Sequence, residues 1–106
     1  MPTDTFAALA NPARRRILEE LREHPAAAGE LAALFAIGRP AVSEHLAVLR
    51  DAGLVAEERE GRRRIYRLTA APLAEVGDWL HPFERYWRDR LRDLSTFLDS
   101  QEDSPS

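Results

Sequence analysis

The sequence predicts a mainly α-helical fold with one small β-hairpin, in the order α-α-α-α-β-β-α. Helix start and stop signals divide residues 3–53 into four short helices. Two segments, LVAEER and RRIYRL, flank the pair Glu60-Gly61, which is typical of a hairpin. The final third carries apolar residues at helical spacing. A chain of 106 residues allows one small domain, whose modest core would gain from a subunit interface.

Local signals mark the first two helices. A short helix is expected through the sequence TFAALA. Asn11 is a predicted N-cap and Pro12 takes the first helical position of the second helix, which together form a strong start signal. Pro25 stops this helix. Three apolar residues share its inner face at helical spacing: Ile17, Leu18 and Leu21.

The third and fourth helices form a helix-turn-helix pattern. The third is expected over residues 26–36, with an inner side made of three residues: Leu31, Leu34 and Phe35. A tight connection containing Gly38 leads to a fourth helix over residues 39–52, which Gly53 ends. Two helices joined by about three residues are the arrangement in which the second helix enters a DNA major groove.

The fourth helix has an apolar face and a polar face. At about 100° per residue, Val42, Leu46 and Leu49 point the same way and must face the domain. A recognition helix presents its N-terminal residues to base edges. This rule selects the residues that we expect to read DNA: Arg39, Pro40, Ser43 and Glu44, with His45 on the flank.

Each residue of this group has a possible role in binding DNA. Arg39 can donate two hydrogen bonds to guanine, and Ser43 can bond a phosphate or a base edge; for both, the alternative is a solvated surface side chain. Glu44 can accept from cytosine N4 or repel phosphate and weaken non-specific binding, and we favour the second. His45 can touch phosphate or pack against the domain. The ring of Pro40 can contact a thymine methyl group.

The hairpin is rich in arginine, although the formal net charge of the chain is -3. Residues 39–67 are the only net-basic third, and a local basic face matters more for nucleic acid than the whole-chain charge. We expect Arg62 and Arg63, at the tip, to meet phosphates or the minor groove, with Arg64 as a further contact. The remaining hairpin arginines, Arg59 and Arg67, are expected to form ion pairs with Glu57 or Glu58 across the hairpin.

Three consecutive arginines, Arg14 to Arg16, lie in the first turn of the second helix. The helix macrodipole disfavours positive charge there. Ion pairs of Arg15 with Glu19 and of Arg16 with Glu20 have the poorer orientation and compensate only weakly. Local stability therefore does not explain the cluster. We expect one of the three, taken as Arg15, to contact phosphate, or else the cluster to face an acidic patch of a dimer.

The last helix carries more apolar surface than a terminal helix of a small monomer can hide. It is expected to be interrupted near His81-Pro82 and to end at about Leu98, so that residues 1–98 form one domain before a disordered acidic tail, residues 99–106. Part of the apolar stripe belongs to the core, and the remainder predicts an interface. The expected dimer contacts are Phe6, Leu9, Leu80, Phe83, Trp87, Leu91, Leu94 and Leu98. A less favoured interpretation is a small-molecule pocket with three aromatic walls: Trp79, Phe83 and Trp87.

Several classes of function are disfavoured by composition. The chain has no cysteine, which removes disulfides, thiolate metal sites and cysteine nucleophiles, and suits a reducing cytoplasm. We see no signal peptide and no apolar run of the roughly 20 residues that a membrane span needs. Ser43 and His45 lie on opposite flanks of one helix and cannot form a nucleophile–base pair. We therefore expect no enzyme.

Three segments, in this order, resemble the ArsR family of small bacterial winged-helix repressors: LANPARRRIL (residues 9–18), ELAALFAIGRPAVSEHLAVLRDAGLV (residues 30–55) and REGRRRIYRL (residues 59–68). The resemblance covers about residues 6–98. It implies a winged helix-turn-helix fold and a homodimer built from the first and last helices. It also implies operator binding by helix 39–52 and by the hairpin, as a wing over residues 59–67, with release on a signal.

Metal sensing is a separate question for this family. Many members use a Cys-x-Cys pair before the turn, where this chain has AGELAALF and no sulfur. Others use an Asp and His set on the last helix. Asp78, His81 and Glu84 lie there, but Pro82 disturbs their shared face, and a closed site needs four good ligands. The chain therefore resembles the branch that lacks the metal-binding cysteines, and we expect no metal and no cofactor.

The favoured function is a dimeric, sequence-specific DNA-binding regulator, taken as a repressor. Its expected partners are a double-stranded operator, a second copy of the chain and an unknown small-molecule effector. The alternative is a winged-helix module that binds a protein instead of DNA, which the acidic net charge and Glu44 favour slightly. A metal-responsive repressor is less favoured. The sequence leaves the operator, the inducer and the regulated genes open.

Overall fold

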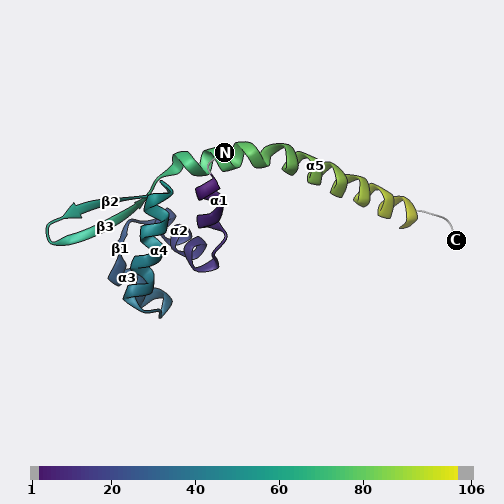
Figure 1. Cartoon of the computed structure of the whole chain (residues 1–106). Helices are drawn as coiled ribbons and strands as arrows, with labels where there is room; N and C mark the ends of the chain where they lie inside the picture. The colour runs from purple at the N-terminus through teal and green to yellow at the C-terminus, as the bar shows by residue number, and fades with distance from the viewer. Residues whose placement is uncertain (1–2, 103–106) are drawn as a thin grey trace. The chain divides into compact units, whose positions relative to one another are not determined.

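The computed structural model describes residues 3–102 and confirms the predicted order of elements, with one short strand added (Figure 1). The elements are α1 (Thr3–Leu9), α2 (Pro12–Glu23), β1 (Ala26–Ala27), α3 (Ala28–Phe35), α4 (Arg39–Asp51), β2 (Val55–Glu60), β3 (Arg63–Leu68) and α5 (Ala70–Glu102). The chain divides into two units, Met1–Ala74 and Glu75–Ser106.

Helix α2 begins with the predicted cap. The side-chain oxygen of Asn11 accepts hydrogen bonds from the backbone N–H groups of Ala13, at 2.8 Å, and Arg14, at 3.2 Å. Pro12 takes the first helical position, where a missing N–H costs nothing. These bonds satisfy two of the donors that a helix start leaves open. The cap therefore fixes where α2 starts.

The core of the first unit lies between α2, α3, α4 and the sheet. Its largest fully buried apolar side chains are Ile17, Leu31, Val42, Leu46, Leu49 and Leu54, which confirms the predicted inner faces of α2 and α4. The prediction for Leu34 is wrong, because this side chain is 57% exposed. At about 100° per residue, Leu34 lies roughly 60° from Leu31 on the side away from Phe35, so the buried arc excludes it.

The sheet has three antiparallel strands in the order β1-β3-β2. Strand β1 was not predicted: Ala26 pairs with Tyr66 and Ala27 with Ile65, so α3 begins two residues later than expected. Two alanines carry no strand preference, and their extended backbone follows from pairing with β3. The short strand ties the start of α3 to the base of the hairpin.

The predicted hairpin is confirmed, and its paired strands extend beyond the expected wing at both ends. Pairing runs from Val55 opposite Leu68 to Glu60 opposite Arg63. Only Gly61 and Arg62 lie in the turn, and Gly61 has φ +66°, a conformation that glycine adopts without strain. The turn therefore holds Arg62 at the tip, while Arg63 already belongs to β3.

Helix α5 differs from its prediction in two ways. It is continuous through Pro82, so the expected interruption near His81 is wrong. Pro82 removes one bond to the carbonyl of Asp78, and that residue is exposed, so water can replace the bond. The helix also runs to Glu102, because no proline or glycine stops it earlier; residues 99–102 of the predicted tail are thus helical. Residues 103–106 of that prediction lie outside the described part.

No single helix within residues 3–102 is long and apolar enough to cross a membrane. Helices α3 and α4 meet the criteria of length and composition only as a pair bent by 119°.

Candidate nucleic-acid interface

The N-terminal end of α4 is exposed, as the recognition-helix prediction requires. Arg39, Pro40, Ser43 and Glu44 are all exposed, whereas His45 is half-buried. The opposite face of the same helix is completely buried, so the domain cannot present this helix in any other rotation. The half-burial of His45 agrees with its packing alternative better than with a free phosphate contact.

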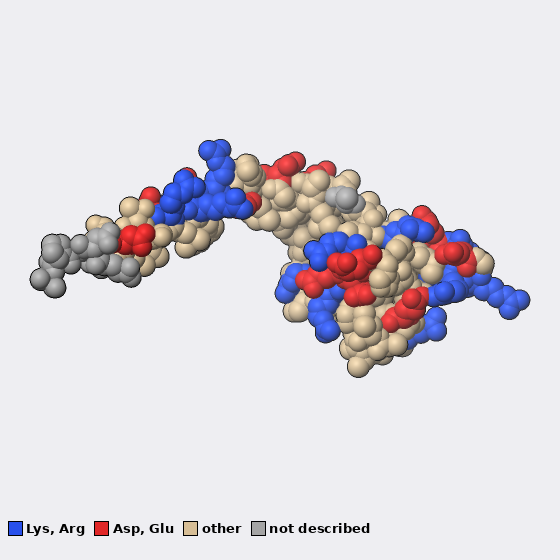
Figure 2. Space-filling model, turned by 180° about the vertical axis from the view of Figure 1, so that it is seen from behind, with Lys and Arg blue, Asp and Glu red and all other residues tan. Residues whose placement is uncertain are grey.

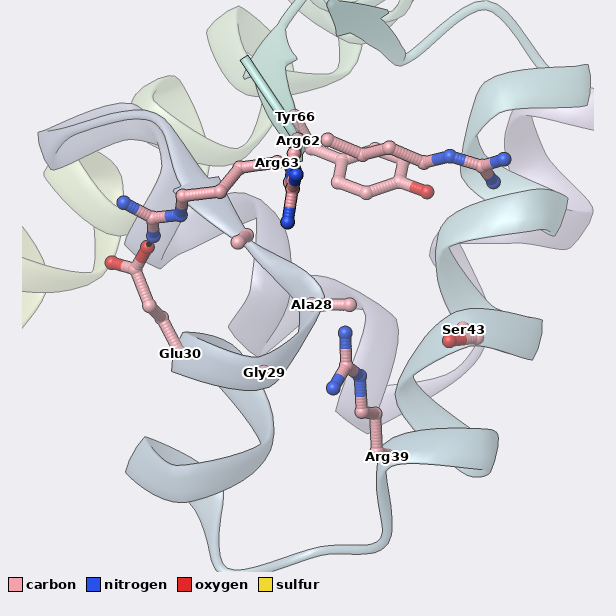
Figure 3. A pocket seen from close by; sticks show the side chains of 10 residues that line it. Ala28, Gly29, Glu30, Arg39, Ser43, Arg62, Arg63 and Tyr66 are labelled. Carbon is pink, nitrogen blue, oxygen red and sulfur yellow. Dashed lines mark hydrogen bonds and ion pairs between the residues drawn. The ribbon is translucent and has the colours of Figure 1, made fainter. Parts of the chain in front are cut away.

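A cleft of about 570 Å³ lies beside this end of α4 (Figure 3). It is bounded by the start of α3, the start of α4 and the hairpin, all within the first unit. Four of its ten lining residues are arginines and one is an acid, so the cleft is strongly basic although the chain is acidic. The lining residues are Ala27, Ala28, Gly29, Glu30, Arg39, Ser43, Arg62, Arg63, Arg64 and Tyr66.

Arg39 belongs to this cleft. Its guanidinium lies close to Gly29, where an added Cβ would stand 3.8 Å from the guanidinium carbon, and Figure 3 shows the side chain reaching from α4 toward the start of α3. In residues 3–102, Arg39 has no acidic partner. The sequence placed Arg39 with the base-reading residues, whereas its observed orientation joins it to the arginines of the hairpin.

The arginines of the hairpin differ in their partners. Arg62, in the turn, has no acidic partner within the described part of the chain. Arg63 forms an ion pair with Glu30 of α3 (Figure 3). Arg59 lacks the expected partner: it lies opposite Arg64 in the sheet register, and other arginines pair with Glu57 and Glu58. The predicted tip pair Arg62 and Arg63 is therefore split into one unpaired and one neutralised guanidinium.

Glu57 connects the hairpin to the end of α4. Its carboxylate accepts a hydrogen bond from Arg50 at 3.2 Å and forms an ion pair with Arg64 at 3.3 Å, and it is the least exposed acid of the hairpin ion pairs. This network fixes the direction of the hairpin relative to α4. The pair of Arg67 and Glu58, at 2.6 Å, confirms the cross-strand prediction for Arg67.

Acidic and basic side chains therefore alternate on the surface of the first unit, as the visible face in Figure 2 shows. Ion pairs occupy three of the five hairpin arginines. Surface pairs of this kind contribute little to stability. Their main consequence is to determine which guanidinium groups remain available to an anion.

The arginines at the start of α2 have local partners. Arg14 donates to the carbonyl oxygens of Ala8, at 2.8 Å, and Ala7, at 3.1 Å, while Arg15 donates to that of Leu9, at 2.7 Å. These carbonyls belong to the last turn of α1, where a helix leaves carbonyl acceptors without intrahelical donors and favours positive charge. The two arginines thus join α2 to α1.

Arg16, the third arginine at the start of α2, contacts an aromatic ring. Its guanidinium carbon lies 4.6 Å from the centre of the Phe35 ring, a cation–π contact that joins α2 to α3. All three arginines therefore have intramolecular roles that the sequence did not reveal. The phosphate contact expected of Arg15 stays a prediction, and the bond to Leu9 explains the position of this residue without DNA.

The apolar residues of α5 are exposed in the single chain. Every α5 residue that was predicted for the dimer interface is between 44% and 63% exposed: Leu80, Phe83, Trp87, Leu91, Leu94 and Leu98. The aromatic rings contact one another along the helix, with 4.8 Å between the ring centres of Trp79 and Phe83. Phe6 and Leu9 of α1 are half-buried. Within the described residues, no three His, Asp or Glu side chains form a group that would hold a metal ion.

Sequence reasoning missed Glu30, Gly29 and Glu57 as parts of this site. Glu30 and Arg63 are separated by 33 positions, and no local pattern links them. Gly29 has no side chain to attract notice, although it is the residue against which Arg39 lies. The only available signal was the excess of acids flanking the arginines, and it indicated the pair of Arg67 with Glu58 but not the pairs made by Glu30 and Glu57.

Comparison with known proteins agrees with the helix-turn-helix fold described above and identifies the family. Residues 11–57, the region of the helix-turn-helix, match the family of bacterial regulatory proteins described as the arsR family. The HTH-type transcriptional regulator Rv2034 of Mycobacterium tuberculosis is 40% identical over 96% of this chain and 92% of its own. The transcriptional repressor SdpR of Bacillus subtilis is 32% identical over 76% of this chain and 89% of its own.

A solved structure shares the fold. The ArsR-like transcriptional regulator from Rhodococcus sp. RHA1 superposes with a TM-score of 0.69 at 32% identity, over 89% of each chain. These proteins are transcriptional regulators and not enzymes, in agreement with the class of function that the sequence predicts. The chain belongs to the ArsR family of helix-turn-helix transcriptional regulators.

Proposed function

We propose that this regulator is a repressor that binds double-stranded operator DNA as a homodimer. The N-terminal half of α4 enters the major groove, and the hairpin lies against the flanking backbone or minor groove. The observation that carries the proposal is the basic cleft, in which the exposed end of α4 and the arginine-rich hairpin form neighbouring walls. A duplex that meets one wall also meets the other.

Within α4, the base-reading role falls to Pro40, Ser43 and Glu44. All three are exposed on the first two turns of the helix, where a recognition helix meets base edges. Ser43 also lines the cleft, so it lies between the reading surface and the backbone contacts. Glu44 accepts from cytosine or repels sequences that place phosphate or an acceptor opposite it.

Backbone binding falls first to Arg39 and Arg62. Both line the cleft and both lack an acidic partner in the part of the chain that the structure describes. An unpaired guanidinium can bind a phosphate with two parallel hydrogen bonds and releases counterions as it does so. Arg64 shares Glu57 with Arg50 and supports the hairpin more than it binds DNA.

The homodimer forms through α5, together with α1. Within residues 75–102, the described part of the second unit, one helix has no second element beside it to cover its apolar side chains. Contiguous exposed aromatic and leucine residues of this kind mark an interface. A second copy supplies a matching surface under two-fold symmetry, and it presents two copies of α4 to two operator half-sites. A small-molecule effector that releases the operator stays a prediction.

The proposal is tested by titrating the purified protein against a duplex from the region upstream of its own gene and against a duplex of unrelated sequence. We expect tighter binding to the upstream duplex and a steep loss of affinity as salt rises, because phosphate contacts release counterions. If neither duplex is bound at low salt, the repressor proposal fails, and the protein-interaction alternative takes its place. Equal binding of both duplexes would contradict sequence-specific reading.

A further inference from the structure

The ion pair between Glu30 and Arg63 joins two residues that line the basic cleft. Glu30 lies in the first turn of α3 and Arg63 is the first residue of β3, so the pair joins two elements that are distant in sequence (Figure 3). Both side chains remain about half exposed, with 60% of Arg63 and 48% of Glu30 open to solvent. Both side chains are therefore accessible to a DNA backbone that enters the cleft.

Glu30 is the only acid among the residues that line this cleft. Its carboxylate offers Arg63 the same chemistry that a phosphate would offer, two oxygens with negative charge. An exposed ion pair contributes little to the stability of the fold. Fold stability therefore does not explain why an acid lies in a surface proposed to bind a polyanion.

We propose that Glu30 is a positioning residue that restrains the hold of the hairpin on the DNA backbone. It keeps Arg63 paired inside the protein and leaves Arg39 and Arg62 as the phosphate contacts of the cleft. The inference rests on the proposed DNA-binding function and adds to it a limit on sequence-independent affinity. A regulator restrained in this way releases non-cognate DNA more readily.

The test is Glu30→Gln in the full-length protein, measured on a duplex of unrelated sequence at several salt concentrations. Freeing Arg63 adds one phosphate contact in each protomer, two in the DNA-bound dimer, which steepens the slope of log affinity against log salt by about 1.8. The same relation gives a gain in affinity of up to about 60-fold near 0.1 M salt, falling to about fivefold near 0.4 M. A purely structural role for Glu30 would change thermal stability and leave the salt slope unaltered.

Glu58→Gln is the matched control. Glu58 lies on the hairpin that carries Arg63 and pairs with Arg67, but neither Glu58 nor Arg67 lines the cleft. Both substitutions remove one negative charge and free one arginine. We expect the control to shift the slope by much less than Glu30→Gln does.

The double variant Glu30→Gln with Arg63→Gln separates the ion pair from bulk charge. It has the net charge of the wild-type protein, and we expect it to return to wild-type affinity and slope. The inference is wrong if Glu30→Gln matches the Glu58→Gln control, or if its gain survives in the double variant. Absence of any wild-type binding at low salt would instead remove the proposed function itself, so the two failures are distinguishable.

Discussion

The two unpaired arginines of the cleft make the strongest prediction about DNA binding. Replacing both, by Arg39→Ala with Arg62→Ala, removes two guanidinium groups that line one cleft and have no acidic partner in residues 3–102. Each phosphate contact contributes about 0.9 to the slope of log affinity against log salt, and the DNA-bound dimer carries two copies of each arginine, so the slope should fall by about 3.6. Near 0.1 M salt, the same relation corresponds to a loss of affinity of up to about 4,000-fold for the dimer, or about 60-fold for each protomer.

Fluorescence anisotropy of a labelled duplex, titrated at several salt concentrations, measures both quantities. The matched control is Arg88→Ala with Arg92→Ala, which removes the same charge from exposed positions of α5, outside the cleft. We expect the control to retain most of the affinity and slope. An unchanged slope in the cleft variant, or an equal fall in the control, would refute the assignment of these two arginines.

Three further predictions concern assembly, stability and protonation. Trp87→Glu places a charge in the exposed apolar stripe of α5 and should convert the dimer to a monomer in sedimentation velocity; a retained dimer would contradict the proposed interface. Thr5 is fully buried and its hydroxyl has no hydrogen-bond partner among the described residues, so Thr5→Val should raise the free energy of unfolding by about 1–2 kcal/mol in denaturant melts, and a loss of stability would count against it. The pKa of His24 is raised above 6.5 because its ring Nδ1 is hydrogen-bonded to the carbonyl oxygen of Pro25, and the charge of Glu20 adds to this effect. The associated stabilisation is complete below pH 6.5 and is lost as the pH rises through the raised pKa; NMR titration should show a lower pKa in Glu20→Gln, and an equal pKa would exclude that contribution.

Local patterns predicted those parts of the fold that local physics determines. The spacing of Val42, Leu46 and Leu49 identified the buried face of α4, because helical geometry alone brings them together. Asn11 and Gly61 identified a helix start and a turn, since a cap and a positive φ depend on one or two residues. The direction in which the recognition helix faces followed from these features.

Tertiary contacts determined the parts that were missed. Strand β1 exists because β3 lies beside it, and its alanines have no pattern of their own. Arg14 and Arg15 looked like candidates for phosphate because their true acceptors, the carbonyls at the end of α1, come from the preceding helix. The hairpin arginines look alike in sequence, whereas the positions of Glu30 and Glu57 divide them into paired and unpaired groups.

The central claim is that α4 lies in the major groove of DNA. The chain has no cysteine, so Ser43→Cys creates a single attachment point on the exposed end of α4 for a chelate that cleaves DNA. We predict cleavage of the bound upstream duplex at two clusters separated by one helical turn, about 10 base pairs, or a multiple of it, as expected for two half-sites of a dimer. Cleavage spread evenly along the bound duplex, or no cleavage near it, would contradict the placement of α4.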